Sequence, residues 1–561
     1  MAEPSILKGS DHFFTNLYEG NGGGQRVGNF VPFTYNATID KSCKFDHVTN
    51  NFLSRTPSSN GSGTKLTLSV WVKRTSHLGV ADILYNGNIT STSEHLYFDS
   101  SNRLQYYEVT SGSRKWDYVT TRTFEDTSKW YHIHVVRDTT DSTAGDRIRI
   151  YVDGTRITAF DTSTQPSENA TGYWNKTSYQ HSIGSTGNAS YIRGIGYLAE
   201  MNMIDGTVYE PSTFGMTDTS TGRWIPKTYS SLSYGTNGFR FQFANSAGQT
   251  IGDDTSGNGN DYAVTNLAAT DITTDSPTQN HTTLNQIKNS NITLSEGDLI
   301  AATVSGGQSY VSGSQIPMTS GKYYGEIKIT NAGSVLFFVG VGNYNDYLDH
   351  YTAENPLSKI EGGYIRSDTG QGYTAFGDTG TYRTYGSSYT TNDIMGFAID
   401  VDKGAIWISK NNTWYNSASA SEIQNGDVSN SLVTGVKGPL IILNNTHSGT
   451  TVEYNFGQKG FEYTPPTGYN AIQQDNLPET SKGIPDFVWI KNRDATDAHQ
   501  IYDSNRGPQK DLNISTVHES TTTDGLQKFL KGGFAIEDDV SVNTSGESYV
   551  SWNWLNNGGT T

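Results

Sequence analysis

Hydrophobic and polar residues alternate along several short stretches of the chain between residues 40 and 245. The stretches 66–74 (LTLSVWVKR), 129–138 (KWYHIHVVRD) and 148–157 (IRIYVDGTRI) show this pattern most clearly. A period of two places alternate residues on one face of a β-strand, because successive side chains point to opposite faces. In the first stretch the apolar residues on one face are Leu66, Leu68, Val70 and Val72. The pattern predicts a sandwich of antiparallel strands.

A second set of alternating stretches follows, between residues 293 and 472. It includes 320–329 (SGKYYGEIKI) and 392–412 (NDIMGFAIDVDKGAIWISKNN). Glycine-containing turns, Asp153-Gly154 and Asp402-Lys403-Gly404, each lie between two apolar runs and indicate β-hairpins. No amphipathic stretch of about twelve residues predicts a long helix. The prediction is therefore an all-β chain with two antiparallel, jelly-roll-like sandwiches in tandem.

Changes in composition divide the chain into five parts. The C-terminal part is short and aromatic, and it ends on a Gly-Thr run directly after the predicted strand SYVSWNW, so its completeness stays open. The N-terminal part is rich in glycine and is expected to be an extended arm. Four phenylalanines would anchor this arm on a partner: Phe13, Phe14, Phe30 and Phe33. The five predicted parts are an arm (1–37), a first sandwich (38–245), a polar connection (246–292), a second sandwich (293–472) and a C-terminal β segment (473–561).

The composition narrows the function classes. With 561 residues the chain is too long for one hydrophobic core. Its formal net charge of −17 argues against nucleic-acid binding, because an acidic surface repels phosphate. The single cysteine, Cys43, excludes an internal disulfide and is expected to be buried as a small apolar side chain. No apolar run approaches ~18 residues, so we expect no membrane insertion, and the N-terminus lacks the pattern of a secretory signal.

The order of these stretches resembles known families. The first sandwich resembles a laminin-G-like domain of the concanavalin A-like lectin/glucanase superfamily, through the three alternating stretches above together with IGSTG (183–187) and GYLAEMNMIDG (196–206). The second resembles a SPRY domain, through SGKYYGEIKI, VGVGN (339–343), GGYI (362–365) and NFGQKGFEYTPPTGY (455–469). The whole series is similar to large virion proteins of marine tailed bacteriophages. The further matching motifs are FLSRTPSS (52–59), DDTSGNGNDY (253–262), PDFVWIKNRDATDAHQIYDSNRG (485–507) and SYVSWNW (548–554).

The phage resemblance implies a function that composition alone does not. It implies a non-enzymatic structural protein of the virion, a tail or head fibre that adheres to glycans on the host surface. Its expected partners are other virion proteins, contacted through the arm, and host glycans, with a homotrimer as one candidate assembly. A decoration or adaptor protein without a receptor role is an alternative, and a polysaccharide-degrading glycoside hydrolase on the same sandwich is another.

The sequence offers little support for hydrolysis. A retaining glucanase on this fold needs paired carboxylates on one strand face. The nearest candidates, Glu200 and Asp205, are separated by an odd number of residues, which places them on opposite faces of a strand. His132 and His134 share a strand face and could share a metal ion, but core packing is the preferred interpretation.

A cofactor is not required by any of these motifs, but calcium is a candidate. The stretch DDTSGNGNDY is rich in the oxygen ligands that Ca²⁺ prefers. The same residues also favour a sharp turn, since Gly and Asn tolerate positive φ. The turn is the preferred interpretation, and the candidate calcium ligands are Asp253, Asp254, Asn258, Asn260 and Asp261.

Aromatic residues in loop-like stretches are candidates for stacking on sugar rings. They occur in RKWDYV, TGYWNKT and NTWYN, and packing within the sandwich is the alternative for each. The segment 376–391, FGDTGTYRTYGSSYTT, is a second candidate recognition surface. The candidate sugar-stacking residues are Trp116, Tyr118, Tyr173, Trp174, Trp414 and Tyr415.

Overall fold

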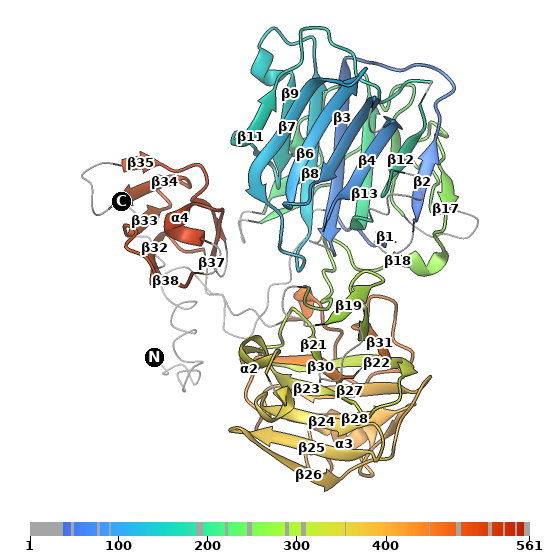
Figure 1. Cartoon of the computed structure of the whole chain (residues 1–561), viewed down its shortest axis with the longest axis vertical. Coiled ribbons are helices and arrows are strands. Elements are labelled where there is room, and N and C mark those ends of the chain that lie inside the picture. Colours follow the sequence, from blue (N-terminus) through green and yellow to red (C-terminus); the bar gives the residue numbers. More distant parts are fainter. Residues whose placement is uncertain are drawn as a thin grey trace, which may run out of the picture.

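The computed structural model is an all-β molecule with two large sandwiches and a small third unit (Figure 1). The structure describes residues 37–46, 50–75, 79–88, 91–177, 179–186, 194–218, 223–243, 250–286, 291–303, 310–353, 355–447, 449–477, 484–513, 519–530, 533–544 and 547–554. The candidate anchors Phe13, Phe14, Phe30 and Phe33 lie outside the described residues.

The first sandwich contains two antiparallel sheets of eight strands each. The first sheet has the order β10-β9-β8-β3-β13-β1-β18, with β16 paired to β13; we call it sheet A. Its strands are β10 (Thr155–Arg156), β9 (Ile148–Val152), β8 (Tyr131–Asp138), β3 (Lys65–Arg74), β13 (Gly196–Asp205), β1 (Ser42–Phe45), β18 (Ile272–Thr273) and β16 (Phe239–Phe241). The second sheet, sheet B, contains β11 (Phe160–Thr164), β7 (Ser113–Thr123), β6 (Arg103–Thr110), β5 (Thr92–Phe98), β4 (Ala81–Asn88), β12 (His181–Ile183), β2 (Phe52–Arg55) and β17 (Ala263–Thr265), in that order.

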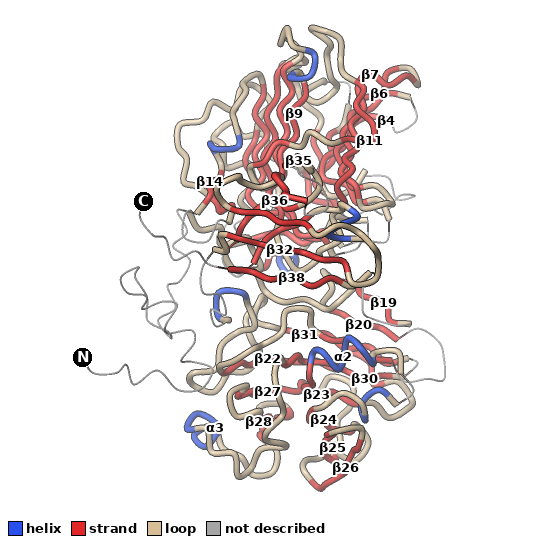
Figure 2. Tube along the Cα trace, turned by 90° about the vertical axis from the view of Figure 1, so that its left-hand side faces the viewer, coloured by secondary structure: helices blue, strands red, loops and turns tan. Residues whose placement is uncertain are grey.

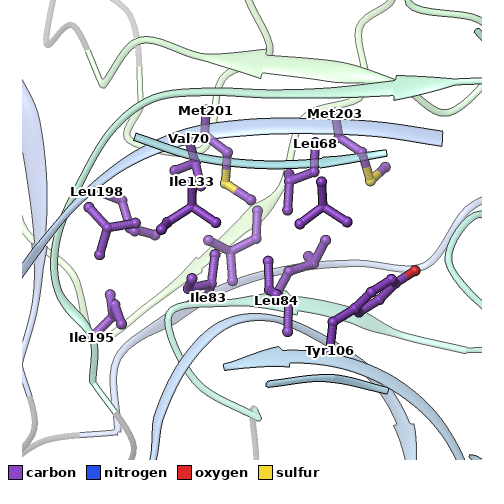
Figure 3. Packing of buried hydrophobic residues seen from close by; sticks show 14 of the residues in the cluster. Leu68, Val70, Ile83, Leu84, Tyr106, Ile133, Ile195, Leu198, Met201 and Met203 are labelled. Carbon is purple, nitrogen blue, oxygen red and sulfur yellow. The ribbon is translucent and has the colours of Figure 1, made fainter. Parts of the chain in front are cut away.

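The core of this sandwich lies between the two sheets, as the alternation predicts. Figure 3 shows Leu68 and Val70 of β3 facing Ile83 and Leu84 of β4 across the layer. All four predicted apolar positions of β3 belong to this core, and Cys43 is buried in it as expected. The turn between β9 and β10 is also confirmed, because Asp153 and Gly154 have φ of 50° and 75°, the positive values that a two-residue hairpin turn needs.

The second sandwich is built in the same way. Its sheets have the orders β19-β20-β31-β22-β27-β28-β29 and β21-β30-β23-β24-β25-β26. The strands of the first are β19 (Ile292–Ser295), β20 (Ile300–Thr303), β31 (Thr450–Asn455), β22 (Lys322–Ala332), β27 (Ile394–Asp400), β28 (Ala405–Lys410) and β29 (Thr413–Trp414). Those of the second are β21 (Tyr310–Gly313), β30 (Leu440–Thr446), β23 (Phe338–Asn343), β24 (Gly362–Arg366), β25 (Gln371–Phe376) and β26 (Thr379–Thr384). Two short helices, α2 (Tyr344–His350) and α3 (Ala420–Asn425), complete the described part.

The C-terminal unit contains a five-stranded sheet and a separate hairpin. In Figure 2 it lies in front of the junction between the two sandwiches. The sheet has the order β35-β34-β33-β32-β38, and the hairpin is β36-β37. The elements are β32 (Phe487–Asn492), β33 (Gln500–Asp503), β34 (Lys510–Asn513), β35 (Glu519–Thr521), β36 (Leu526–Leu530), β37 (Gly533–Ile536), α4 (Val540–Asn543) and β38 (Tyr549–Trp554).

The predicted polar connection is part of the folded structure rather than a solvated linker. Its strands β17 and β18 extend sheets B and A, so the first sandwich continues to Thr273. Residues 275–283 are then mostly buried between the two sandwiches. Asp275 accepts hydrogen bonds from Lys73 Nζ at 2.8 Å and from Trp130 Nε1 at 3.1 Å. Polar residues can be buried here because protein groups satisfy their hydrogen bonds.

Candidate functional site

The outer face of sheet A carries an unusual set of polar and aromatic side chains. This face lies opposite the core and includes Ser69 and Trp71 of β3, His132 of β8 and Asn202 of β13. A ribbon of two short strands, β14 (Gly215–Thr217) and β15 (Trp224–Pro226), belongs to the segment that covers it. Trp224 of β15 donates a hydrogen bond from Nε1 to His132 Nδ1 at 3.0 Å. Two hollows open beside this ribbon, and Trp71 lines both of them.

His132 and His134 are packed in the interior, and core packing is also the interpretation that the sequence favours over a shared metal ion. Both are fully buried, and their ring centroids are 6.1 Å apart. His132 Nε2 lies 2.8 Å from Ser69 Oγ, and His134 Nε2 lies 3.0 Å from the carbonyl oxygen of Tyr209. Burial lowers the pKa of His132 to about 4 and that of His134 to about 3, so both rings are neutral at pH 7.

The first hollow has a volume of about 460 Å³ and lies next to Glu200, so we call it the Glu200 hollow. It combines the aromatic rings of Trp71 and Tyr229 with hydroxyl, amide, carboxylate and guanidinium groups. Such a mixture is typical of small-ligand sites, where a few polar groups fix orientation beside apolar walls. Its lining residues are Ala37, Thr38, Ile39, Ser69, Trp71, Glu200, Asn202, Phe214, Pro226, Lys227, Thr228, Tyr229 and Arg240.

Glu200 is held in this hollow by a β-bulge. The pairing of β13 with β3 shifts between Ala199 and Asn202, and Glu200 has a φ of 43°. Positive φ is uncommon for a residue with a side chain, and the surrounding structure must hold it. The bulge also breaks the strict alternation that the sequence analysis assumed for this strand. No regular pattern could therefore have indicated where the Glu200 side chain points.

A hydrogen-bond network fixes the side chains of the Glu200 hollow. Glu200 Oε1 accepts from Arg240 Nε at 2.6 Å and from the hydroxyl of Tyr229. The same hydroxyl lies 3.0 Å from Asn202 Oδ1, which also accepts from Tyr234 at 2.6 Å. These groups are positioned before any ligand arrives, which lowers the entropic cost of binding.

Asp205, the other carboxylate of the pair considered from the sequence, does not line the Glu200 hollow. Asp205 accepts hydrogen bonds from the backbone amides of Ser62 at 2.7 Å and Asn237 at 3.0 Å, and so it serves as a structural acceptor. Among the described residues that line the Glu200 hollow, Glu200 is the one carboxylate.

The structure corrects most of the predicted sugar-stacking residues. Trp116 and Trp174 are fully buried, and Tyr118 and Tyr415 are nearly so. The ring of Trp174 stacks on Tyr106, and its Nε1 donates to the carbonyl oxygen of Glu94. These four rings belong to the hydrophobic cores of the sandwiches and line neither hollow. Tyr173 and Trp414 are partly exposed, but they belong to different sandwiches and do not form one site.

A buried ion pair explains why the Trp174 loop turns inward. Glu94 and Arg137 are both fully buried and paired with each other. Glu94 also accepts from the backbone amides of Tyr173 at 2.7 Å and Trp174 at 2.8 Å. The aromatic loop is thus tied to a charge in the core, a constraint that its polar composition did not reveal.

The DDTSGNGNDY loop has the hydrogen bonding of a structural turn. Asp254 Oδ1 accepts from the amides of Arg240 and Ser256, and Oδ2 accepts from Ser256 Oγ and the amide of Asn260. Asp261 accepts from the amide of Asp254, while Asp253 accepts from Thr250.

The asparagines of this loop also bond to the protein. Asn258 and Asn260 each donate to the carbonyl oxygen of Gly238. Gly257 and Gly259 have φ of 93° and 69°, as expected for the turn. Nowhere in the described ranges do three or more His, Cys, Asp or Glu side chains form a group that could hold a metal ion.

The second candidate recognition surface is exposed. Strand β26 forms one edge of its sheet, and all six of its residues are solvent-exposed. Phe376 and Tyr382 on the β25-β26 hairpin are 40% and 48% exposed. This hairpin lies in the second sandwich, apart from the Glu200 hollow. Within the part of the chain that the structure describes, no helix has the length and apolar character needed to cross a membrane.

Two family models match parts of the chain. Residues 48–207 match a model described as the concanavalin A-like lectin/glucanases superfamily, in agreement with the first sandwich. Residues 459–561 match a domain of unknown function, DUF7483.

Solved structures resemble single parts of the chain. The SPRY domain of human HERC1 is 19% identical, with a TM-score of 0.24, and the match covers 32% of this chain and 99% of that domain. A heptameric pentraxin from Limulus polyphemus is 15% identical, with a TM-score of 0.22 and coverage of 30% and 78%. A protein from Bacteroides ovatus, provisionally described as carbohydrate-binding, is 13% identical, with a TM-score of 0.28 and coverage of 42% and 60%. The predicted fold class, all-β with two antiparallel sandwiches in tandem, is confirmed, and the family match supports a concanavalin A-like fold for the first sandwich.

Proposed function

We propose that this chain is a non-enzymatic adhesion protein that binds glycans through the Glu200 hollow. The observation that carries the proposal is the hollow itself, a preorganised set of polar side chains beside Trp71 on the outer face of a lectin-like sandwich. Hydroxyl groups of a sugar can both donate to Glu200 and Asn202 and accept from Arg240 and Lys227. The apolar faces of a sugar ring would pack on the aromatic side chains.

We further propose that the protein is a structural component of a tailed-bacteriophage particle, such as a tail or head fibre. The support is the resemblance of the ordered sequence motifs to virion proteins of marine phages. In this assembly residues 1–37 attach the chain to other virion proteins, and the sandwiches face the host. Display of several copies, for example as a trimer, would raise a weak single-site affinity by avidity.

A binding assay tests the glycan proposal. The full chain is applied to immobilised neutral bacterial polysaccharides, together with the variants Tyr229→Phe and Arg240→Gln. Each variant removes one polar group of the hollow and should weaken binding by about 10-fold, the loss expected for one charged or neutral hydrogen bond. Thr164→Ala, at an exposed position of the edge strand β11 in sheet B, is the control and should bind like the unmodified chain. Equal binding by all variants would exclude the Glu200 hollow as the site.

Two further measurements test the remaining parts of the proposal. Reducing-sugar release from the bound polysaccharide should be absent, and turnover that is abolished by Glu200→Gln would show an enzyme instead. Mass spectrometry of purified phage particles should detect the chain, and deletion of residues 1–35 should remove it from them. A truncated chain that still enters particles would show that the arm is not the anchor.

A further inference from the structure

The second hollow is a cavity of about 300 Å³ at the place where three parts of the chain meet. The lectin-like sandwich contributes the end of β7, the two residues that precede β8 and the β9-β10 hairpin. The C-terminal unit contributes residues of the β36-β37 hairpin, and the buried connection contributes Pro277 and Asn280. A hydrogen bond from Lys528 Nζ to the carbonyl oxygen of Asp153, at 2.7 Å, joins two of these walls. We call this space the junction cavity.

The junction cavity is basic although the protein is acidic. Five basic side chains line it, against the two acidic side chains Asp153 and Glu537, while the whole chain has a net charge of −17. A local excess of positive charge with low-dielectric walls concentrates anions. The five basic residues are Arg122, Lys129, Arg156, Arg223 and Lys528.

Two of these cations form no direct ion pair with a described residue. Arg122 pairs with Glu537 at 3.4 Å, and Arg156 pairs with Asp146 at 2.6 Å. In the described part of the chain, no ion pair includes Lys129 or Lys528. Lys129 Nζ lies 4.5 Å from the centroid of the Tyr131 ring, a weaker partner than a carboxylate. Both lysines are half-buried, and the single Asp153 carboxylate acts on both of them, which leaves an excess of positive charge on this side of the cavity.

The electrostatic environment of Lys129 and Lys528 also favours an anion in this cavity. Burial lowers the pKa of Lys129 and of Lys528, the Asp153 carboxylate partly offsets this by raising each pKa, and the nearby Arg122 lowers each again. Burial alone would raise the pKa of Asp153, but Lys129, Lys528 and Arg122 together hold it below the usual value. The three cations therefore act on one small region, where an anion would be stabilised by all of them.

The remaining walls suit a sugar. Trp71, Trp130 and Trp224 line the cavity, and Thr155, Gln474 and Gln527 add hydroxyl and amide groups. A volume of about 300 Å³ is at the lower end of the range for small-ligand sites. The cavity is therefore suited to a single sugar unit rather than to a polymer.

We propose that the junction cavity binds an acidic sugar, whose carboxylate or sulfate group contacts Lys129 and Lys528. The anionic part of this proposal stands on the charges of the cavity, whereas the sugar part rests on the proposed glycan-binding function. Because the two lysines belong to different domains, the ligand also holds the C-terminal unit against the lectin-like sandwich. The site is separate from the Glu200 hollow, so each can be tested with the other intact.

Calorimetric titration of the full chain with four ligands tests the proposal: glucuronic acid, glucose 6-sulfate, glucose and inorganic sulfate. At least one acidic sugar should bind, at least 10-fold more tightly than glucose and inorganic sulfate. The better acidic sugar identifies the group as carboxylate or sulfate. Binding of glucose with equal affinity, or no binding of either acidic sugar, would overturn the proposal. Equal affinity for inorganic sulfate would overturn its sugar part.

Variants locate the site. Lys129→Met and Lys528→Gln should each weaken binding of the acidic sugar by at least 10-fold, whereas Arg240→Gln should leave it unchanged. Conversely, the lysine variants should bind neutral polysaccharide like the unmodified chain, so failure of one proposal is distinguishable from failure of the other. An unchanged affinity in both lysine variants would overturn the site.

The stability of Lys129→Met without ligand provides an independent test. Lys129→Met should lower the melting temperature only slightly while it abolishes binding, because Lys528 and Arg122 still stabilise the Asp153 carboxylate. A melting temperature that falls strongly would show that Lys129 has mainly a structural role and would contradict the assignment.

Discussion

Lys73 of β3 and Asp275 of the buried connection form an ion pair, with 2.8 Å between Nζ and Oδ2 and both side chains fully buried. The two residues are 202 positions apart in the sequence. Lys73 Nζ also donates to Asn280 Oδ1 at 2.9 Å and to the carbonyl oxygen of His281 at 2.6 Å. One side chain of the first sandwich thus fixes the segment that leads to the second.

Loss of this lysine should destabilise the junction. Lys73→Met leaves the Asp275 carboxylate buried without its counter-ion, which costs about 3–5 kcal/mol. Differential scanning calorimetry of the full chain should show a clearly lower melting temperature. Lys65→Met is the matched control on the same strand, because the Lys65–Asp138 pair is partly exposed and worth less than about 1 kcal/mol. Similar losses in the two variants would contradict the role of the buried pair.

Trp174 should contribute to stability rather than to sugar binding. Trp174→Ala opens a cavity in the first sandwich, and the expected loss is about 3–5 kcal/mol of unfolding free energy. Tyr173→Ala, at the neighbouring and partly exposed position, should cost clearly less. Urea unfolding followed by fluorescence measures both. A Trp174→Ala variant with unchanged stability and lost polysaccharide binding would restore the original interpretation of this residue.

Much of the fold could be predicted from the sequence, because strands with one buried face have a period of two. The four apolar residues of β3 are all in the core, and the Asp153-Gly154 turn has the expected positive φ values. The connection was harder to predict. Its polar residues are buried because they bond to distant groups such as Lys73, and no local pattern reports such a partner.

The candidate site could be predicted less well for the same reason. Trp174 lies among Thr, Gly and Asn, a composition typical of exposed loops, yet its loop is bonded to the buried Glu94. The spacing of Glu200 and Asp205 predicts opposite strand faces, but a bulge in β13 decides the direction of the Glu200 side chain. The basic residues of the junction cavity come from segments far apart in the chain. Their convergence depends on the packing of the domains, which periodicity does not encode.

The buried imidazole of His134 should make stability depend on pH. Its pKa is about 3 in the folded protein and about 6.5 when unfolded, because burial disfavours the charged ring. As the pH falls below about 6.5, the unfolded chain binds a proton that the folded chain does not, so folding stability decreases. In His134→Gln this contribution is absent. The stability difference between the unmodified chain and the variant should shift by about 2 kcal/mol between pH 7 and pH 5.

Urea unfolding of both proteins at the two pH values measures this shift. The unmodified chain should lose more stability on acidification than His134→Gln does. The comparison isolates one residue, since His132, His181 and His281 have lowered pKa values in both proteins. Parallel losses in the two proteins would show that His134 is protonated in the folded state.

The DDTSGNGNDY loop should keep its structure without calcium. Both oxygens of Asp254 already accept hydrogen bonds from the protein, which leaves little reason for a cation to be required. EDTA should therefore leave the melting temperature unchanged, and added Ca²⁺ should not raise it. Asp254→Ala should cost about 1.5–3 kcal/mol, the range for hydrogen bonds to a charged group. Asp253→Ala should cost less, because Asp253 is bonded to Thr250 alone among the described residues. A melting temperature that falls with EDTA and recovers with Ca²⁺ would instead establish a calcium site in this loop.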